Sequence, residues 1–152
     1  MKSTRILALM MWSIFGVVPG LHAACSTASI AGRFGFTTTG SIPAVGQVAA
    51  TGIFTQDVSG NITGTQTRSL NGSVADETFT GTATVNSDCT GTDSIQVFQD
   101  GSLVRTTTLH VVYDDNGREA RAIFTSLVLP NGVSLPSIIT IEARKLFSRE
   151  AD

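Results

Sequence analysis

Few side chains in this 152-residue sequence have the chemistry of catalysis or metal binding. Beyond the apolar N-terminal segment there are two cysteines, Cys25 and Cys89, and one histidine, His110. A redox-active cysteine pair is usually close in sequence, as in Cys-x-x-Cys, and zinc takes three or four Cys and His ligands. The sequence around His110 shows no nucleophile and no orienting acid. We therefore predict no catalytic residues, no metal site and no cofactor.

The N-terminal segment has the pattern of a secretory signal peptide. Lys2 and Arg5 precede an uncharged run, ILALMMWSIFGVV, and small residues follow it. The run is shorter than the about 20 apolar residues that a membrane-spanning helix needs. We therefore predict cleavage after Ala23 or Ala24 and export to the periplasm or the extracellular space.

The rest of the chain is long enough for one domain. We assign residues 1–24 to the signal peptide, 25–148 to the folded domain and 149–152 to a C-terminal tail. Without the signal peptide, eight basic and twelve acidic residues remain, which gives a net charge near −4. Because there is no basic stripe, nucleic acid is not an expected partner.

Export would place Cys25 and Cys89 in an oxidising compartment, where cysteine pairs form disulfides. Such a bond would attach the N-terminal end of the domain to its body. It would close a loop of about 65 residues, worth roughly 4 kcal/mol in the chain-entropy model. Lipid attachment to Cys25 is the alternative, but His22 stands where a lipobox has a Leu-like residue. A lipidated Cys25 would also leave Cys89 unpaired, so we predict a Cys25–Cys89 disulfide.

The domain alternates apolar or small residues with threonine and other polar residues. This period of two is typical of strands with one buried and one solvated face, and Asn-Gly and Asp-Gly turns separate the runs. The eight predicted strands cover residues 30–39, 45–56, 61–70, 75–85, 92–99, 103–113, 119–129 and 137–146. A meander of eight strands removes its edges by closing into a barrel.

Two other all-β architectures fit less well. A sandwich usually needs longer crossover connections than these. A transmembrane barrel needs an apolar outer band with aromatic girdles, whereas one face here is mostly Thr, Ser, Gln and charged residues. We therefore predict a single eight-stranded antiparallel up-and-down barrel that does not cross a membrane. The interior of such a barrel is filled by side chains or holds one small ligand.

The strand at residues 103–113 supplies candidate ligand-binding residues. We expect its face with Leu103, Arg105, Thr107, Leu109, Val111 and Tyr113 to point inward, which places Arg105 and Tyr113 near opposite ends of the barrel. An inward Arg105 could bind a carboxylate bidentately. Alternatively, its stem packs while its guanidinium reaches water. Gln66 is the third candidate.

Glycines recur at positions that the alternation turns inward, namely Gly32, Gly52, Gly64 and Gly81. A glycine inside a strand marks either a sharp bend or a place where a ligand approaches the backbone. Both interpretations stay open at the level of the sequence.

The segment GTATVNSDCTG (residues 81–91) resembles a motif, Gly-Thr-Tyr-x-Val-Asn-Pro-Asp-Cys-Thr-Gly, of small exported bacterial proteins of unassigned function. The segments GRFGF (32–36) and GNITG (60–64) match the same pattern, whereas Ser87 replaces its proline and Ala83 its aromatic residue. The resemblance implies an exported barrel, lipocalin-like or allene-oxide-cyclase-like, and brings no catalytic residues. True lipocalins carry Gly-x-Trp, which GRFGF lacks.

Three functions remain open. The first is binding of a small apolar or amphiphilic molecule inside the barrel, which we favour because the sequence has no catalytic cluster. The second is a cyclase or isomerase of the barrel type, which requires a roomy cavity with convergent polar groups. The third is a structural or interaction protein that acts through its Thr-rich outer surface, and this one predicts a filled barrel.

Overall fold

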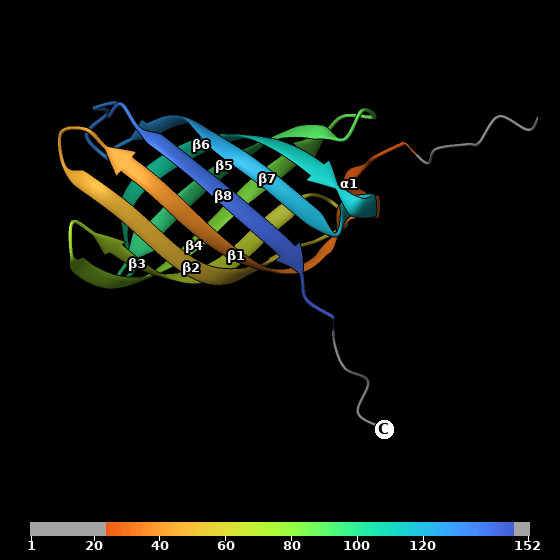
Figure 1. Ribbon diagram of the computed structural model, residues 1–152, viewed down its shortest axis with the longest axis horizontal. Helices are drawn as coiled ribbons and strands as arrows, with labels where there is room; N and C mark the ends of the chain where they lie inside the picture. The colour runs from red at the N-terminus through yellow and green to blue at the C-terminus, as the bar shows by residue number, and fades with distance from the viewer. Residues whose placement is uncertain (1–23, 148–152) are drawn as a thin grey trace, which may run out of the picture.

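The computed structural model describes residues 24–147, and these form a closed barrel of eight strands (Figure 1). Residues 1–23 of the predicted signal peptide and the whole predicted tail, residues 149–152, lie outside the described residues. The strands are β1 (Gly32–Ile42), β2 (Gly46–Gln56), β3 (Asn61–Leu70), β4 (Ser73–Val85), β5 (Thr90–Gln99), β6 (Ser102–Asp114), β7 (Glu119–Val128) and β8 (Ile138–Lys145). A short helix, α1 (Thr27–Ile30), precedes them, and a 3-10 turn, η1 (Asp115–Gly117), joins β6 to β7.

Every strand pairs antiparallel with the strand before it, and β8 pairs with β1 to close the barrel. The register between β1 and β8 runs from Phe34 opposite Lys145 to Ser41 opposite Ile138. The predicted fold, a single eight-stranded antiparallel up-and-down barrel, is confirmed. No helix within residues 24–147 has the length and hydrophobicity that a membrane span requires.

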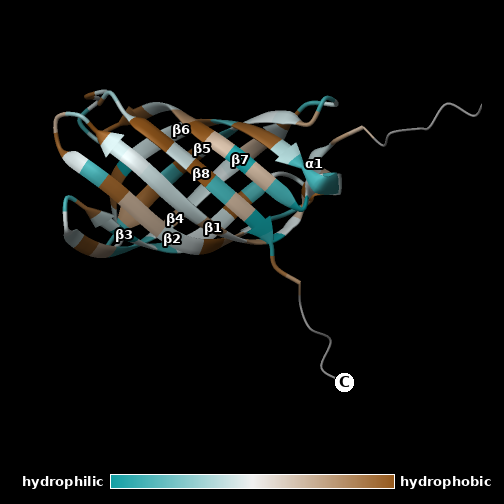
Figure 2. Cartoon of the chain, in the orientation of Figure 1, coloured by the Kyte–Doolittle hydropathy of each residue, from teal (hydrophilic) through white to brown (hydrophobic). Residues whose placement is uncertain are grey.

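The alternation of the sequence sets which side chains point inward. On β4, Phe79 and Ala83 are buried, while the threonines between and beside them are exposed. Threonine suits this outer face because its branched Cβ favours extended backbone while its hydroxyl stays solvated. Figure 2 shows the hydropathy changing along the strands in this way.

Two of the tight turns use the residue pairs that the sequence indicated. Asn71 and Gly72 both have positive φ, 49° and 87°, between β3 and β4. Asp100 and Gly101, at 51° and 77°, do the same between β5 and β6. Consecutive positive φ angles match the twist of the strands in a hairpin, which is why Asn-Gly and Asp-Gly occur there.

Three of the four inward glycines, Gly52, Gly64 and Gly81, lie where neighbouring atoms leave no space for a side chain. A Cβ on Gly52 would collide with the carbonyl oxygen of Thr65 on β3, and one on Gly81 would collide with that of Ser94 on β5. Glycine lets the strands coil tightly enough to close a small barrel. The ring of Phe79 fills the space beside Gly64. At these positions the glycines therefore provide curvature rather than room for a ligand.

The first predicted strand began too early. Ile30, which the alternation assigned to that strand, ends helix α1 instead. Ser26 caps this helix, since its hydroxyl accepts from the Ser29 N–H while the Ser29 hydroxyl accepts from the Ser26 N–H. A helix of four residues is too short to show a 3.6-residue period, so the sequence pattern did not reveal it.

Helix α1 lies at one end of the barrel (Figure 1). Ile30 is 1% exposed and packs into the core that contains Phe34. The predicted disulfide is present: Cys25 is bonded to Cys89 in the turn between β4 and β5, with 5.0 Å between their Cα atoms. The bond attaches the segment before α1 to the rim of the barrel, although Cys25 precedes α1 rather than the first strand.

The two ends of the barrel therefore differ. The end that carries α1 and the β2–β3, β4–β5 and β6–β7 turns is called the helix end below. The end that carries the β1–β2, β3–β4, β5–β6 and β7–β8 connections is called the loop end.

Candidate ligand-binding cavity

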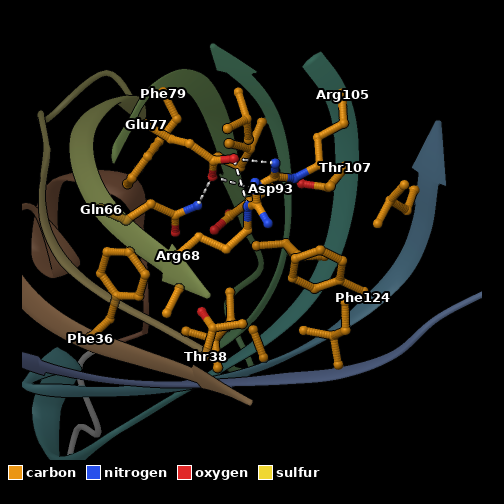
Figure 3. A pocket seen from close by; sticks show the side chains of 18 of the residues that line it. Phe36, Thr38, Gln66, Arg68, Glu77, Phe79, Asp93, Arg105, Thr107 and Phe124 are labelled. Atoms are coloured by element: carbon orange, nitrogen blue, oxygen red, sulfur yellow. Dashed lines mark hydrogen bonds and ion pairs between the residues drawn. The ribbon is translucent and has the colours of Figure 1, made fainter. Parts of the chain in front are cut away.

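The barrel encloses a cavity of about 380 Å³ (Figure 3). All eight strands contribute to its lining, and most of the lining side chains are apolar. The cavity extends to residues of the loop end, among them Val45, Leu129 and Leu135. Its volume lies within the range of about 300 to 1,000 Å³ that is usual for sites of small molecules.

Phenylalanine rings form much of the apolar wall. The Phe36 ring lies 5.8 Å from Phe79 in an edge-to-face arrangement and 5.9 Å from Phe54. Phe34 stacks on Phe54 at 4.9 Å, nearer the helix end, and is itself fully buried. Such ring pairs are stabilised beyond the area they bury, so this wall is expected to be rigid.

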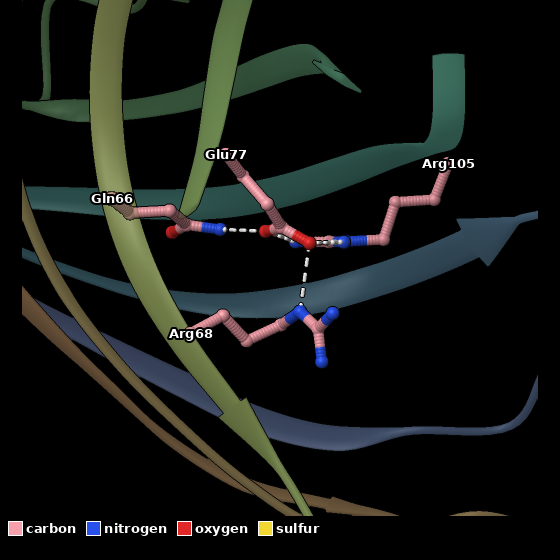
Figure 4. Close-up of polar contacts among 4 residues, drawn as sticks. All are labelled: Gln66, Arg68, Glu77 and Arg105. Atoms are coloured by element: carbon pink, nitrogen blue, oxygen red, sulfur yellow. Dashed lines mark hydrogen bonds and ion pairs between the residues drawn. The ribbon is translucent and has the colours of Figure 1, made fainter. Parts of the chain in front are cut away.

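One buried carboxylate organises the polar part of the cavity. Glu77 accepts four hydrogen bonds, two on each oxygen (Figure 4). Arg105 donates to both oxygens, from Nη1 at 2.8 Å and from Nη2 at 2.7 Å. Arg68 Nε donates to Oε1 at 2.7 Å, and Gln66 Nε2 donates to Oε2 at 2.6 Å. These four residues are called the Glu77 cluster below.

The Glu77 side chain is fully buried, and those of Arg68 and Arg105 are 14% and 16% exposed. Burial by itself raises the pKa of Glu77, but the hydrogen bonds and charge of Arg105 and the hydrogen bonds from Arg68 and Gln66 outweigh it. The pKa of Glu77 falls to about 2 as a result. The carboxyl is therefore ionised at neutral pH.

Three strands hold this cluster together. Gln66 on β3 lies directly opposite Glu77 on β4, and Arg68 is two residues further along the same inward face of β3. Arg105 comes from β6, beyond β5. The register between β5 and β6 shifts here, because Val97 pairs with Arg105 and Phe98 with Leu103, which leaves Val104 as an extra residue. This bulge is why Val104 and Arg105 both line the cavity.

A second polar group lies toward the helix end of the cavity. Gln56, Asp93 and Tyr113 all line it, and three of their atoms are buried without a hydrogen-bond partner among the described residues: Gln56 Nε2, Asp93 Oδ1 and Tyr113 Oη. Burial raises the pKa of Asp93 to about 7. Burial, with the charge of Asp93 as a further cause, raises the pKa of Tyr113. The Asp93 carboxyl can therefore carry a proton near neutral pH.

The three residues that the sequence predicted for ligand binding all line the cavity, but they do not form one site. Arg105 and Gln66 meet at Glu77, in the half near the loop end. Tyr113 lies apart, with Asp93 and Gln56. The Arg105 guanidinium pairs with Glu77 of the chain itself through both of its terminal nitrogens, which the sequence did not predict. His110 is exposed on the outer face.

Sequence reasoning missed the remaining members of the two polar groups just described: Glu77, Arg68, Asp93 and Gln56. The alternation contained a signal for each. Glu77 lies two residues before Phe79 on β4, and Asp93 lies two residues before Ile95 on β5. The alternation therefore places both acidic residues on inward faces. Charged residues in a strand are usually solvated, so the polarity of these side chains argued against placing them inside the barrel.

Within residues 24–147 no group of three or more His, Cys, Asp and Glu side chains is placed to hold a metal ion. No protein-family model matches the sequence, and no curated protein matches it either. Solved structures do match its fold. A redesigned β-barrel, mFAP1, bound to DFHBI, matches with a TM-score of 0.54 and 15% identity, over 79% of this chain and 98% of that chain.

A second redesigned β-barrel matches with a TM-score of 0.53 and 16% identity, over 82% of this chain and 99% of that one. At this level of identity the likeness shows the architecture alone. The protein is thus a β-barrel of the same architecture as these redesigned barrels, with a disulfide and a polar cluster in its interior.

Proposed function

We propose that this protein binds one small, largely apolar molecule inside its barrel. The observation that carries the proposal is the cavity of about 380 Å³, whose wall is mostly apolar and holds a few convergent polar groups. This combination is the usual composition of a small-molecule site. Leaving such a volume unfilled forfeits contacts among the lining side chains, and a ligand would restore them.

The cavity also bears on the other functions considered from the sequence. A protein that acts only through its outer surface would be expected to have a filled barrel, and this cavity argues against that role. One of the matched designed barrels was solved bound to DFHBI, so a barrel of this architecture can hold a small molecule. That support concerns the architecture and does not extend to the identity of a ligand.

An isomerase or cyclase is the second candidate, and Asp93 is the observation that favours it. A carboxyl with a pKa of about 7 inside an apolar cavity is suited to give and take protons at neutral pH. Tyr113 lines the same part of the cavity. An Asp93→Asn variant that binds a substrate but no longer converts it would support this role, whereas unchanged conversion would contradict it.

We also propose that the protein acts outside the cytoplasm. The support is the signal-like segment at the N-terminus together with the Cys25–Cys89 bond, since disulfides persist mainly in oxidising compartments.

Native mass spectrometry of the protein exported to an oxidising periplasm tests the binding function. We expect an extra mass on the folded protein that is lost when the same sample is denatured. Ala50 and Ala49 offer a matched pair of variants, because Ala50 lines the cavity whereas Ala49 is exposed on the other face of β2. Ala50→Phe should abolish the extra mass and Ala49→Phe should preserve it. A bare wild-type protein, or equal retention by both variants, would contradict binding in the cavity.

A further inference from the structure

We propose that the ligand is a monoanion with an apolar body, and that Arg68 binds its acidic group. This inference rests on the proposed binding function and specifies its chemistry. It follows from the charge, the hydrogen bonds and the position of the Glu77 cluster.

The cluster carries one more positive charge than it can neutralise. Arg68 and Arg105 each contribute a cation, and Glu77 is the single anion between them. A net charge in a low-dielectric interior is costly unless an opposite charge accompanies it. One ligand anion would neutralise the excess positive charge in this half of the cavity.

Asp93 is the other acidic side chain that lines the cavity, and it does not neutralise the excess positive charge of the Glu77 cluster. It lies on β5 four residues from Val97, whose neighbour in the register is Arg105. At about 3.3 Å per residue, those four residues span roughly 13 Å along the strand. Asp93 Oδ1 has no hydrogen-bond partner among residues 24–147, so neither arginine binds it there.

The hydrogen bonds identify Arg68 as the guanidinium whose terminal nitrogens have no partner among the described residues. Both oxygens of Glu77 already accept two hydrogen bonds each, and Arg105 uses both of its terminal nitrogens on them. Arg68 uses Nε on Glu77, whereas its Nη1 is buried and has no partner among the described residues. A buried N–H without an acceptor is unfavourable, and a carboxylate is the acceptor that matches the planar guanidinium best.

The surroundings of Arg68 fit an amphiphile rather than a bare inorganic anion. Ala50 lies directly opposite Arg68 in the register of β2 and β3, so a small side chain flanks the guanidinium. The loop end of the cavity also contains an aliphatic wall that includes Val48, Leu127 and Ile139. A monocarboxylate would place its acidic group at Arg68 and its apolar body against this wall and the phenylalanine rings (Figure 3).

Calorimetric titration with octanoate, 1-octanol and inorganic phosphate tests the inference. The first two probes share their apolar chain and differ in charge, while phosphate carries charge without a chain. We expect wild-type protein to bind octanoate at least about tenfold more tightly than 1-octanol, because a charge-assisted hydrogen bond contributes more than a neutral one. Phosphate should not bind.

Arg68→Gln should remove the preference for octanoate while 1-octanol binds as before. The control is Arg121→Gln, on the outer face, where the side chain is 66% exposed; this variant should keep the preference.

Equal affinity of wild-type protein for octanoate and 1-octanol would overturn the anion inference and leave the binding function standing. Failure of both probes to bind would contradict the binding function as well. Binding of phosphate as tight as that of octanoate would also overturn the inference, since the apolar body would then contribute nothing.

A measurement on the wild-type chain keeps the inference testable if Arg68→Gln does not fold. In isotope-labelled protein, the Nε–Hε NMR signal of Arg68, assigned with an Arg68→Lys variant, should move on addition of octanoate and not on addition of 1-octanol. An equal response to both probes would contradict binding of the acidic group by Arg68.

Discussion

Arg105 holds Glu77 through both of its terminal nitrogens, at 2.8 and 2.7 Å, although the two residues lie on strands that are not neighbours in the sheet. Glu77 is on β4 and Arg105 on β6, so their ion pair spans β5 inside the barrel. With Arg68 on β3, one carboxylate connects side chains from both sides of β4 across the interior. The Glu77 cluster is therefore both a part of the cavity lining and a link between strands.

The first prediction is that Glu77→Gln destabilises the fold strongly. Removing one partner of a buried ion pair leaves an uncompensated charge, which typically costs about 3 to 5 kcal/mol. Here two arginines would lose their shared anion. Urea unfolding followed by circular dichroism measures the free energy of unfolding.

The control for this prediction is Glu119→Gln, which removes an exposed pair with Arg144 at 3.0 Å. Such a surface pair contributes less than about 1 kcal/mol. Equal losses in the two variants would show that the Glu77 cluster does not stabilise the barrel.

The second prediction concerns the pH dependence that Glu77 gives to stability. Its folded-state pKa, about 2, is below the unfolded value of 4.5, so the unfolded chain binds the proton more readily. The stabilisation from Glu77 is complete above about pH 4.5 and is lost as the pH falls towards 2. Thermal unfolding across this range should show wild-type protein losing stability faster than Glu77→Gln on acidification. Parallel curves for the two proteins would contradict the assignment.

The third prediction concerns Asp93, whose contribution to stability changes with pH in the opposite direction to that of Glu77. Its folded-state pKa of about 7 is above the ordinary value of 3.8, so the folded protein holds the proton more tightly. Wild-type protein should lose up to roughly 4 kcal/mol through this group as the pH rises from about 4 to about 7. Asp93→Asn should lack this loss and be the more stable protein at about pH 8, since the amide stays neutral.

Unfolding curves at several pH values compare Asp93→Asn with Asp100→Asn, which removes the same charge from an exposed turn. The stability of Asp100→Asn should change with pH as that of the wild-type protein does. If the stability of Asp93→Asn also changes with pH in the wild-type way, Asp93 is ionised in the folded protein at neutral pH.

The fourth prediction concerns the Cys25–Cys89 disulfide. Replacing both cysteines by serine should cost about 2 to 5 kcal/mol, since the bond closes a loop with a sequence separation of 64 residues. The loss should begin at the helix end, where the bond holds the segment before α1. Hydrogen exchange should become faster at Ile30 before it does in β3. Uniform acceleration over the whole barrel would contradict a local role.

The sequence sufficed for most of the strands and turns because each is defined by neighbours along the chain. Alternating threonines predicted β3 and β4, and Asn71-Gly72 predicted their hairpin. The same reasoning predicted that Arg105 and Tyr113 point inward, near opposite ends of the barrel. These features depend on periodicity, which one sequence contains in full.

The partners of those residues could not be predicted in the same way. Hairpin register relates Glu77 to Gln66, but no turn relates Glu77 to Arg105, because their contact depends on the curvature and stagger of the closed barrel. Bulges add to the difficulty. The extra residue Val104 brings two consecutive residues of β6 to the cavity. On β7 the extra residue Thr125 interrupts the alternation, so that the next residue after Phe124 to line the cavity is Leu127.

The fifth prediction separates two reasons for glycine in this barrel. Gly52 has room for no Cβ, because the backbone of Thr65 and Gln66 lies against it. Gly101 has open space around it but a φ of 77°, which side chains disfavour. Gly101→Ala should therefore cost about 1 kcal/mol through backbone strain alone. Gly52→Ala should cost roughly 3 kcal/mol or more, since β2 and β3 must move apart.

Urea unfolding of both variants gives the two free energies, and the cavity supplies a second readout. If tight coiling at Gly52 shapes the interior, Gly52→Ala should also weaken binding of octanoate, whereas Gly101→Ala, at the tip of a hairpin, should not. A Gly52→Ala variant as stable as Gly101→Ala would mean that the sheet relaxes around an added methyl group. Closure of the barrel would then not depend on glycine at this bend.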